Sequence, residues 1–231
     1  MDLSGAVWGA GYGAGVLRFL KREPSAVLLA VQLAGVLLYP FMEGEGAGRA
    51  LFSVFGIIVL ALAVLAVRSS PALTWVSLLL GAPALVLLAI QAITGDDALL
   101  PYSSALEAIL YFYAGGALIA YMLADHEITR DELYAVGATF TLVAWAFAYV
   151  YVVCQAIYPG SFIAAIEPEA DRTWIELLFL SFTTLSSTGL SDVVPVEPFA
   201  RGLVMMEQLA GVAYVVMLVS RLVALTIPRR A

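Results

Sequence analysis

The sequence predicts an all-α membrane protein with six transmembrane helices, a re-entrant pore helix and a filter loop. Three observations lead to this fold class. The chain of 231 residues is 62% hydrophobic and only 13% charged, a composition that would leave a soluble domain with large exposed apolar patches. Six apolar segments are each close to the ~20 residues needed to cross ~30 Å of hydrocarbon. A shorter apolar segment and the hydroxyl-rich run 184–192 lie between the last two of them.

Turn-forming residues, many of them acidic, separate the six apolar segments. The expected spans cover residues 25–41, 50–67, 71–93, 102–123, 133–158 and 199–227. The first is broken near Pro40, and Pro83 is expected to kink the third. Thr129 and Glu132 have the spacing of a capping box that starts the fifth. Residues 1–23 precede the spans, either along the membrane surface or as a poorly ordered terminus.

The basic residues predict the orientation of the chain, because they are enriched in cytoplasmic loops. With six spans, both termini share a side, and that side carries Arg18, Lys21, Arg22, Arg68, Arg130, Arg221, Arg229 and Arg230. The other side carries only Arg49, Arg172 and Arg201. We therefore expect a multi-pass protein of the cell (plasma) membrane, surrounded by lipid, with both termini in the cytoplasm.

Composition also argues against several functions. The formal net charge of −7 disfavours a nucleic-acid partner. Cys154 and His126 are single residues of their kinds, so no cysteine and histidine cluster is available for a metal. No pair of catalytic groups is placed near the midplane of the membrane. We expect neither an enzyme nor a cofactor.

The short apolar segment at residues 173–186 predicts a helix that reaches only ~21 Å, too short to cross a bilayer. A half-helix that ends inside the membrane directs its carbonyl end, with about half a negative charge, towards the interior. Such an end favours a cation in the space beyond it. We expect this pore helix to enter from outside.

The loop after this helix is the candidate ion site, and its residues are Ser187, Thr188, Gly189, Leu190 and Ser191. Its carbonyl and hydroxyl oxygens can replace the hydration shell of a monovalent cation as the chain returns outward in an extended strand. Gly189 permits backbone conformations closed to other residues. One loop cannot surround an ion, so several copies are expected to meet with cyclic symmetry. The alternative is an ordinary surface turn.

Five residues are expected to support the loop, and they are Thr183, Thr184, Glu176, Asp192 and Glu207. Asp192 closes it and is positioned to brace it through a hydrogen bond. Glu207 lies in the last span, where it either hydrogen-bonds the pore helix at Thr183 or Thr184 or reaches polar loop atoms. Glu176 is expected to play the same part from the pore helix.

Two further residues of the last span are of interest. Gly211 lies midway along it, as a gating hinge or as a small residue that allows close helix packing. Arg221, near the cytoplasmic end, is expected to extend to the membrane interface.

Residues 181–198, which read S-F-T-T-L-S-S-T-G-L-S-D-V-V-P-V-E-P, resemble the pore region of the tetrameric potassium-channel superfamily, whose usual pattern is S-F-x-T-x-T-T-V-G-Y-G-D-x-x-P. The continuation through Ala200-Arg201-Gly202-Leu203, Met206-Glu207 and Val219-Ser220-Arg221-Leu222-Val223 is similar to prokaryotic members with one pore domain. The resemblance covers about residues 173–225. It implies a homotetramer that conducts potassium or another monovalent cation.

Two positions depart from that pattern. Leu190 stands where the family has an aromatic residue, and Ser191 replaces the second glycine. The permeant ion therefore stays open. The pattern S-x-T-G-L-S is also similar to the single-glycine loops of Trk and Ktr transporters, which carry four loops in one chain. The alternative function is a non-conducting regulatory or structural homologue.

The resemblance divides the chain into a peripheral and a pore domain. Residues 24–126 are expected to form a four-helix domain placed like a voltage sensor, and residues 127–231 the pore domain. The fourth span contains no Arg or Lys, and Glu107 is its only charge. A voltage sensor needs several positive charges in the field, so we expect no charged voltage sensor. Because the tails are short, a gate is expected in the membrane part, in the filter or in a separate regulatory subunit.

Overall fold

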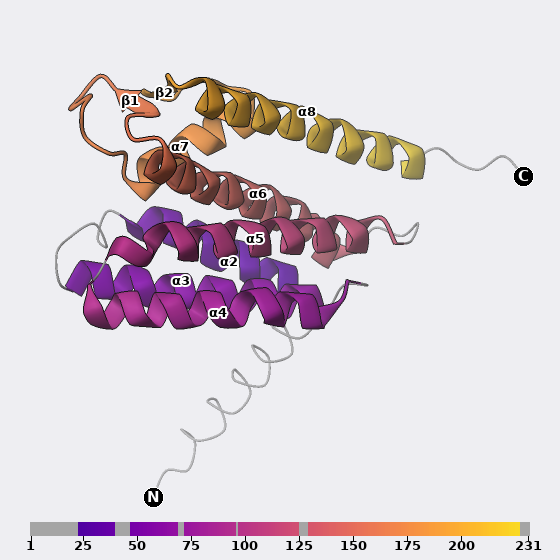
Figure 1. The fold of residues 1–231 in the computed structure, drawn as a ribbon. Coiled ribbons are helices and arrows are strands. Elements are labelled where there is room, and N and C mark those ends of the chain that lie inside the picture. The colour runs from indigo at the N-terminus through magenta and orange to yellow at the C-terminus, as the bar shows by residue number, and fades with distance from the viewer. Residues whose placement is uncertain (1–22, 40–46, 69–71, 96, 125–128, 227–231) are drawn as a thin grey trace, which may run out of the picture.

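The structure is a computed structural model of the chain, and it describes residues 23–39, 47–68, 72–95, 97–124 and 129–226 (Figure 1). Its helices and strands are α2 (Pro24–Leu38), α3 (Ala47–Arg68), α4 (Thr74–Thr94), the 3-10 turn η2 (Asp97–Leu99), α5 (Leu100–Met122), α6 (Arg130–Ile157), β1 (Phe162–Ala164), α7 (Trp174–Leu185), β2 (Val193–Pro195) and α8 (Pro198–Thr226). The predicted N-terminal segment and the break at Pro40 lie outside the described residues.

Every predicted span coincides with a helix, to within a few residues at each end. Among the described residues, four helices are long and apolar enough to cross a membrane, namely α4, α5, α6 and α8. The helix α2 is shorter, and the described apolar part of α3 runs over Val54–Val67. The chain is thus a predominantly helical membrane protein. The strands β1 and β2 form a small sheet that the all-α prediction did not include.

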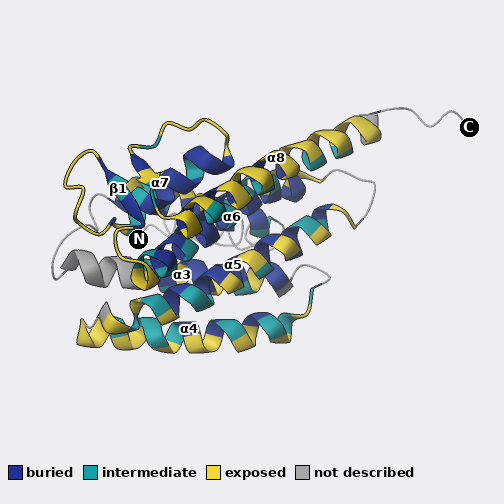
Figure 2. Ribbon diagram, turned by 45° about the horizontal axis from the view of Figure 1, so that its top comes forward, coloured by how far each residue is buried: buried dark blue, intermediate teal, exposed yellow. Residues whose placement is uncertain are grey.

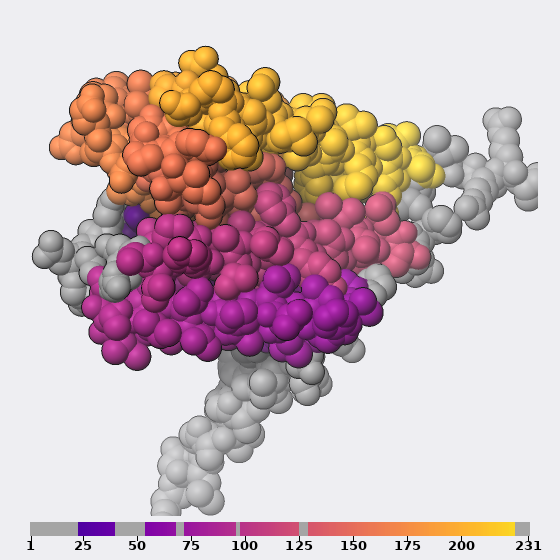
Figure 3. Space-filling view, viewed as in Figure 1, coloured from indigo at the N-terminus to yellow at the C-terminus, as the bar shows by residue number. Residues whose placement is uncertain are grey.

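The helix α6 lies in the middle of the molecule, with α8 on one side and α5 with α2, α3 and α4 on the other (Figure 1). The space-filling view shows the same two layers, the orange and yellow C-terminal part above the magenta and purple helices (Figure 3). One hydrophobic core joins residues of five helices, including Leu28, Val59, Tyr111, Trp145 and Leu178. The described helices before and after the predicted domain boundary therefore share one core, and the division into two domains stays a prediction.

The first residues of α6 form hydrogen bonds with the first residues of α2. Thr129 is the N-cap of α6, and its hydroxyl accepts a hydrogen bond from the Glu132 amide at 3.2 Å, as the capping spacing predicted. The carboxylate of Asp131 accepts hydrogen bonds from the amide and the hydroxyl of Ser25, both at 2.9 Å. It thereby satisfies donors at the beginning of α2, which have no partner within that helix.

The helix α8 exposes most of its apolar surface in a single chain (Figure 2). Only 22% of its candidate span is buried. Its exposed apolar residues include Met205, Met206, Leu209, Val212, Val215, Val216, Val219, Leu222 and Val223. Side chains of this kind on a membrane helix face either lipid or another protein surface.

Candidate functional site

The short helix α7 begins at a complete capping box. The Thr173 hydroxyl accepts a hydrogen bond from the Glu176 amide at 3.4 Å, and the Glu176 carboxylate accepts one from the Thr173 amide at 2.6 Å. The helix has 12 residues, about 18 Å at the usual rise. Its limited length agrees with the predicted half-helix. Glu176 supports the start of α7, at the opposite end from the candidate loop.

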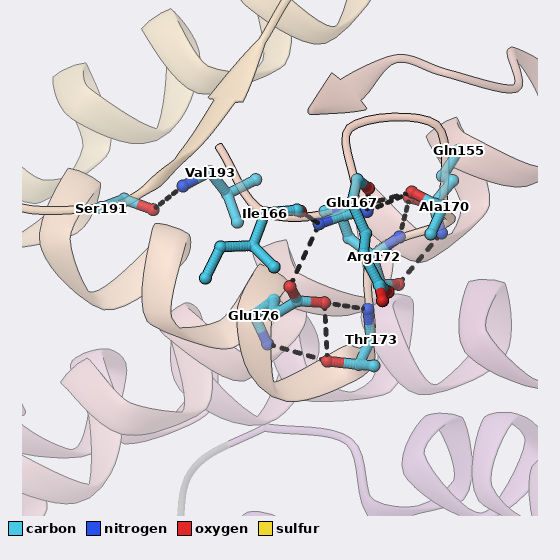
Figure 4. A network of polar contacts seen from close by, with 9 residues as sticks. All are labelled: Gln155, Ile166, Glu167, Ala170, Arg172, Thr173, Glu176, Ser191 and Val193. Atoms are coloured by element: carbon cyan, nitrogen blue, oxygen red, sulfur yellow. Dashed lines mark hydrogen bonds and ion pairs between the residues drawn. The ribbon is translucent and has the colours of Figure 1, made fainter. Parts of the chain in front are cut away.

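Arg172 organises the backbone that leads into α7 (Figure 4). Its side chain is 3% exposed, and its guanidinium forms an ion pair with Glu176 at 3.3 Å. The same group donates to three carbonyl oxygens of the preceding loop, those of Ile166, Glu167 and Ala170. A planar guanidinium can satisfy several acceptors at once. The loop from 166 to 172 and the start of α7 therefore form one unit.

Gln155 ties this unit to α6 (Figure 4). Its side-chain oxygen accepts from the Arg172 amide at 2.8 Å, and its side-chain nitrogen donates to the Arg172 carbonyl at 3.1 Å. The sequence did not predict a contact between Gln155 and Arg172. No spacing pattern relates two residues that lie 17 positions apart. The only available signal was an arginine beside an N-cap threonine.

The end of α7 folds the candidate loop back onto itself. The carbonyl oxygen of Thr183 accepts hydrogen bonds from the amides of Thr188 and Gly189, at 2.9 and 3.1 Å. The carbonyl of Thr184 accepts one from the Ser187 amide at 3.0 Å. The last carbonyls of a helix have no partner within the helix, so the loop satisfies them. Thr183 and Thr184 therefore contact the loop through their backbone oxygens.

The loop has an irregular backbone and is not an extended strand. Ser187 and Gly189 have φ angles of 60° and 65°, both in the left-handed region that glycine adopts easily and other residues adopt at a cost of about 1 kcal/mol or more. The bonds to the Thr183 carbonyl impose this curvature. Residues 186–190 are exposed in a single chain, and Leu190 is 76% exposed.

A two-stranded sheet holds the chain after the loop. The strand β2 pairs antiparallel with β1, with Val193 opposite Ala164 and Pro195 opposite Phe162. The Ser191 hydroxyl accepts a hydrogen bond from the Val193 amide at 3.0 Å (Figure 4). Asp192 is exposed, and its carboxylate accepts no hydrogen bond from the residues that the structure describes. Its predicted bracing role therefore depends on groups outside this set.

Glu207 lies behind α7, fully buried between helices. Its carboxylate accepts hydrogen bonds from the Tyr151 hydroxyl of α6 and the Ser181 hydroxyl of α7. Glu207 thus contacts the pore helix, but at Ser181 and not at Thr183 or Thr184. Ser181 lies on the side of α7 that faces α6, where its hydroxyl is also 2.7 Å from the Ala144 carbonyl oxygen. This carboxylate joins α6, α7 and α8.

Two other residues of α8 contact neighbouring helices. Gly211 lies where α8 passes the end of α7, and a Cβ atom there would lie 2.0 Å from the Leu185 carbonyl oxygen. The glycine therefore permits close packing, and its hinge role remains a prediction. Arg221 forms an ion pair with Glu132 at 2.8 Å, with exposed side-chain fractions of 13% and 4%. The sequence did not predict this pairing with Glu132, and the expectation that Arg221 extends to the membrane interface stays a prediction.

A half-length helix and an irregular loop between two long helices define a membrane protein with a re-entrant loop. Residues 136–227 match a protein-family model described as "Ion channel". The matched range runs from the first turns of α6, through α7 and the loop, beyond the end of α8 at Thr226. No curated protein and no solved structure matches the chain. This part of the chain is similar to ion channels, and the match supports its predicted relationship to the potassium-channel superfamily.

Proposed function

We propose that four copies of this chain assemble around an axis and conduct potassium or another monovalent cation passively through residues 187–191. The observation that carries this proposal is the position of the loop. It follows the carbonyl end of a helix too short to cross a membrane, and it lies between the long helices α6 and α8. Polar backbone at membrane depth is tolerated only where it is buried in protein or lines a water-filled cavity.

Exposure of the loop supports assembly from several copies. Residues 186–190 are exposed in the single chain, and the apolar side of α8 beside them is exposed as well. Neighbouring copies would cover both surfaces and leave the loops facing a common axis. A homotetramer is the assembly that the superfamily relationship implies, and cyclic symmetry is the usual form of such a ring.

The charges around the loop favour a cation. The carbonyl end of α7 contributes a partial negative charge next to the loop. Exposed carboxylates lie on the segments before and after α7 and the loop, and they are Glu167, Glu169, Asp171, Asp192 and Glu197. A cleft lined by charges of one sign concentrates ions of the opposite sign. In the proposed orientation these carboxylates face the outside and both termini face the cytoplasm.

The composition of the helix α5 supports the proposal that gating does not use a charged voltage sensor. It contains no Arg or Lys over Leu100–Met122, and its one charged residue, Glu107, is buried. A helix that carries no positive charge gains little energy from a change in membrane potential. The stimulus would then act on the loop, on α8 or on a separate subunit.

The second candidate is a non-conducting homologue, and Leu190 is the observation that favours it. Leu190 is 76% exposed, so within one chain it makes little packing contact that could hold the loop. A loop without this support would collapse or admit no ion. Assembly without flux is the outcome that distinguishes this candidate.

Flux into liposomes tests the proposal. Purified protein reconstituted in lipid vesicles should pass potassium or sodium down a gradient, and reversal potentials in the two ions give the selectivity. Gly189→Asp should abolish the flux. Gly160→Asp is the matched control, because Gly160 also has a positive φ, of 77°, and open space around it, but lies in the segment between α6 and β1. Unchanged flux in Gly189→Asp would refute the assignment of the loop as the ion path.

A further inference from the structure

A cavity lies between the end of α7, the candidate loop and α8, and polar residues contribute to its lining. Its volume is about 220 Å³, and it is lined by Thr183, Thr184, Ser187, Gly189 and Gln208. Four of these residues belong to the pore helix or the loop. Gln208 is the exception, because it comes from the long helix α8. A side chain from a second element therefore reaches the same space as the loop.

The two neighbouring polar residues of α8 point in different directions. Glu207 is fully buried and faces Ser181 and Tyr151. Gln208 is exposed in a single chain, and its carboxamide forms no hydrogen bond with the residues that the structure describes. An amide without a partner is costly inside a membrane. Gln208 must therefore meet a polar group or a ligand in the assembled protein.

The loop atoms that remain available to contact such a ligand are mainly oxygen atoms. The amides of Thr188 and Gly189 already donate to the Thr183 carbonyl, and the Ser187 amide donates to the Thr184 carbonyl. These donors are used within the turn. The hydroxyl of Ser187 and the carboxamide oxygen of Gln208 remain without partners among the described residues. Neutral oxygens of this kind can substitute for the water around an alkali cation.

We propose that Gln208 determines ion specificity, and that its carboxamide oxygen contacts a partly hydrated monovalent cation held in this cavity beside Ser187 and Thr184. This inference rests on the proposed function, since it assigns a further ligand to the same ion path. It accounts for Gln208, which is the polar side chain that α8 contributes to this cavity among the residues that the structure describes. It also predicts that removing the oxygen changes the preference among cations and leaves the fold intact.

Cation binding can be measured independently of conduction. The melting temperature of the detergent-purified oligomer is followed as potassium, sodium or rubidium chloride is titrated at constant ionic strength with a large organic cation. A bound ion stabilises the folded state by an amount that rises with the logarithm of its concentration relative to its dissociation constant. Gln208→Leu should weaken the apparent affinity for the preferred ion about tenfold, the effect of losing one ligand of ordinary strength. Leu209→Ala is the control, because Leu209 is the next residue, is 64% exposed and does not line the cavity.

Reversal potentials in liposomes provide the second readout. Gln208→Glu has nearly the same shape and adds a negative charge, so it should change the potassium-to-sodium permeability ratio and introduce block by barium. It also keeps the test decisive if Gln208→Leu does not assemble. Wild-type affinities and an unchanged ratio in conducting Gln208→Glu would overturn the inference. If the wild-type protein carries no flux but Gln208→Glu alters the ion-dependent melting, the proposed function fails and the binding role of Gln208 stands.

Discussion

Gly211 of α8 lies against Leu185, the last residue of α7, so closely that a Cβ atom on the glycine would be 2.0 Å from the Leu185 carbonyl oxygen. The nearest atoms are backbone atoms, which cannot rotate away as a side chain can. This contact fixes the distance between the long helix and the end of the pore helix. Leu185 is followed within two residues by the first left-handed residue of the loop, Ser187.

Replacing Gly211 with alanine should separate α8 from α7. We expect a loss of about 1–3 kcal/mol of stability, the usual effect of overpacking, together with a large decrease in flux. Gly202→Ala is the matched control on the same helix, because nothing lies within 4 Å of a Cβ there. Thermal melting of the purified oligomer measures the stability of both variants. Equal melting temperatures for the two variants would contradict the close contact.

Removing the Glu207 carboxylate should destabilise the contacts that join α7 to α6 and α8. Glu207→Ala leaves the Tyr151 hydroxyl without its acceptor, at a cost of about 1–3 kcal/mol, while the Ser181 hydroxyl keeps only the Ala144 carbonyl oxygen as an acceptor. Glu207→Gln keeps one acceptor oxygen and should be milder. Glu197→Ala, at an exposed position, should melt like the wild type. A Glu207→Ala protein as stable as this control would show that the contacts contribute little.

The positions of the helices along the chain were predicted well because local sequence signals specify them. Apolar segments of sufficient length, the Thr129 cap and the short segment 173–186 each give a helix with the expected bounds. The motif at residues 181–198 also predicted the similarity to ion channels. These signals need no information about which residues meet in space.

The contacts that hold the site were harder to predict. The ion pair of Arg221 with Glu132, 89 positions away along the chain, was not predicted. Gln155, Arg172 and Gln208 have no distinctive spacing. The pairing of β1 with β2 joins segments on either side of α7. Partners of this kind depend on the packing of helices, which periodicity does not specify.

The ion pair between Arg221 and Glu132 should stabilise the far end of α8. Both side chains are mostly buried, so Arg221→Gln leaves a buried carboxylate without its charged partner and should cost about 3–5 kcal/mol. The double variant Arg221→Gln with Glu132→Gln should recover about 1–3 kcal/mol of this loss. A double-mutant cycle on melting temperature measures the coupling. Additive effects would mean that the pair is not formed in the membrane.

Arg172→Lys should loosen the segment that leads into α7. An ammonium group can pair with Glu176 but cannot reach three carbonyl oxygens in the geometry of a guanidinium. We expect faster amide hydrogen exchange over residues 166–173 and reduced flux, with the helices α5 and α6 unchanged. Arg201→Lys is the comparison, because Arg201 is exposed and its side chain donates to one carbonyl, that of Pro195. Equal exchange in both variants would show that the Arg172 network does not hold this segment.

The most direct test of the ion path is an experimental structure of the purified protein in lipid nanodiscs, determined by electron cryo-microscopy in potassium. We predict a ring of four chains in which residues 187–191 of each copy surround the symmetry axis, with ion density between their oxygen atoms. A monomer, or an assembly that places these residues away from the axis, would contradict the proposed channel.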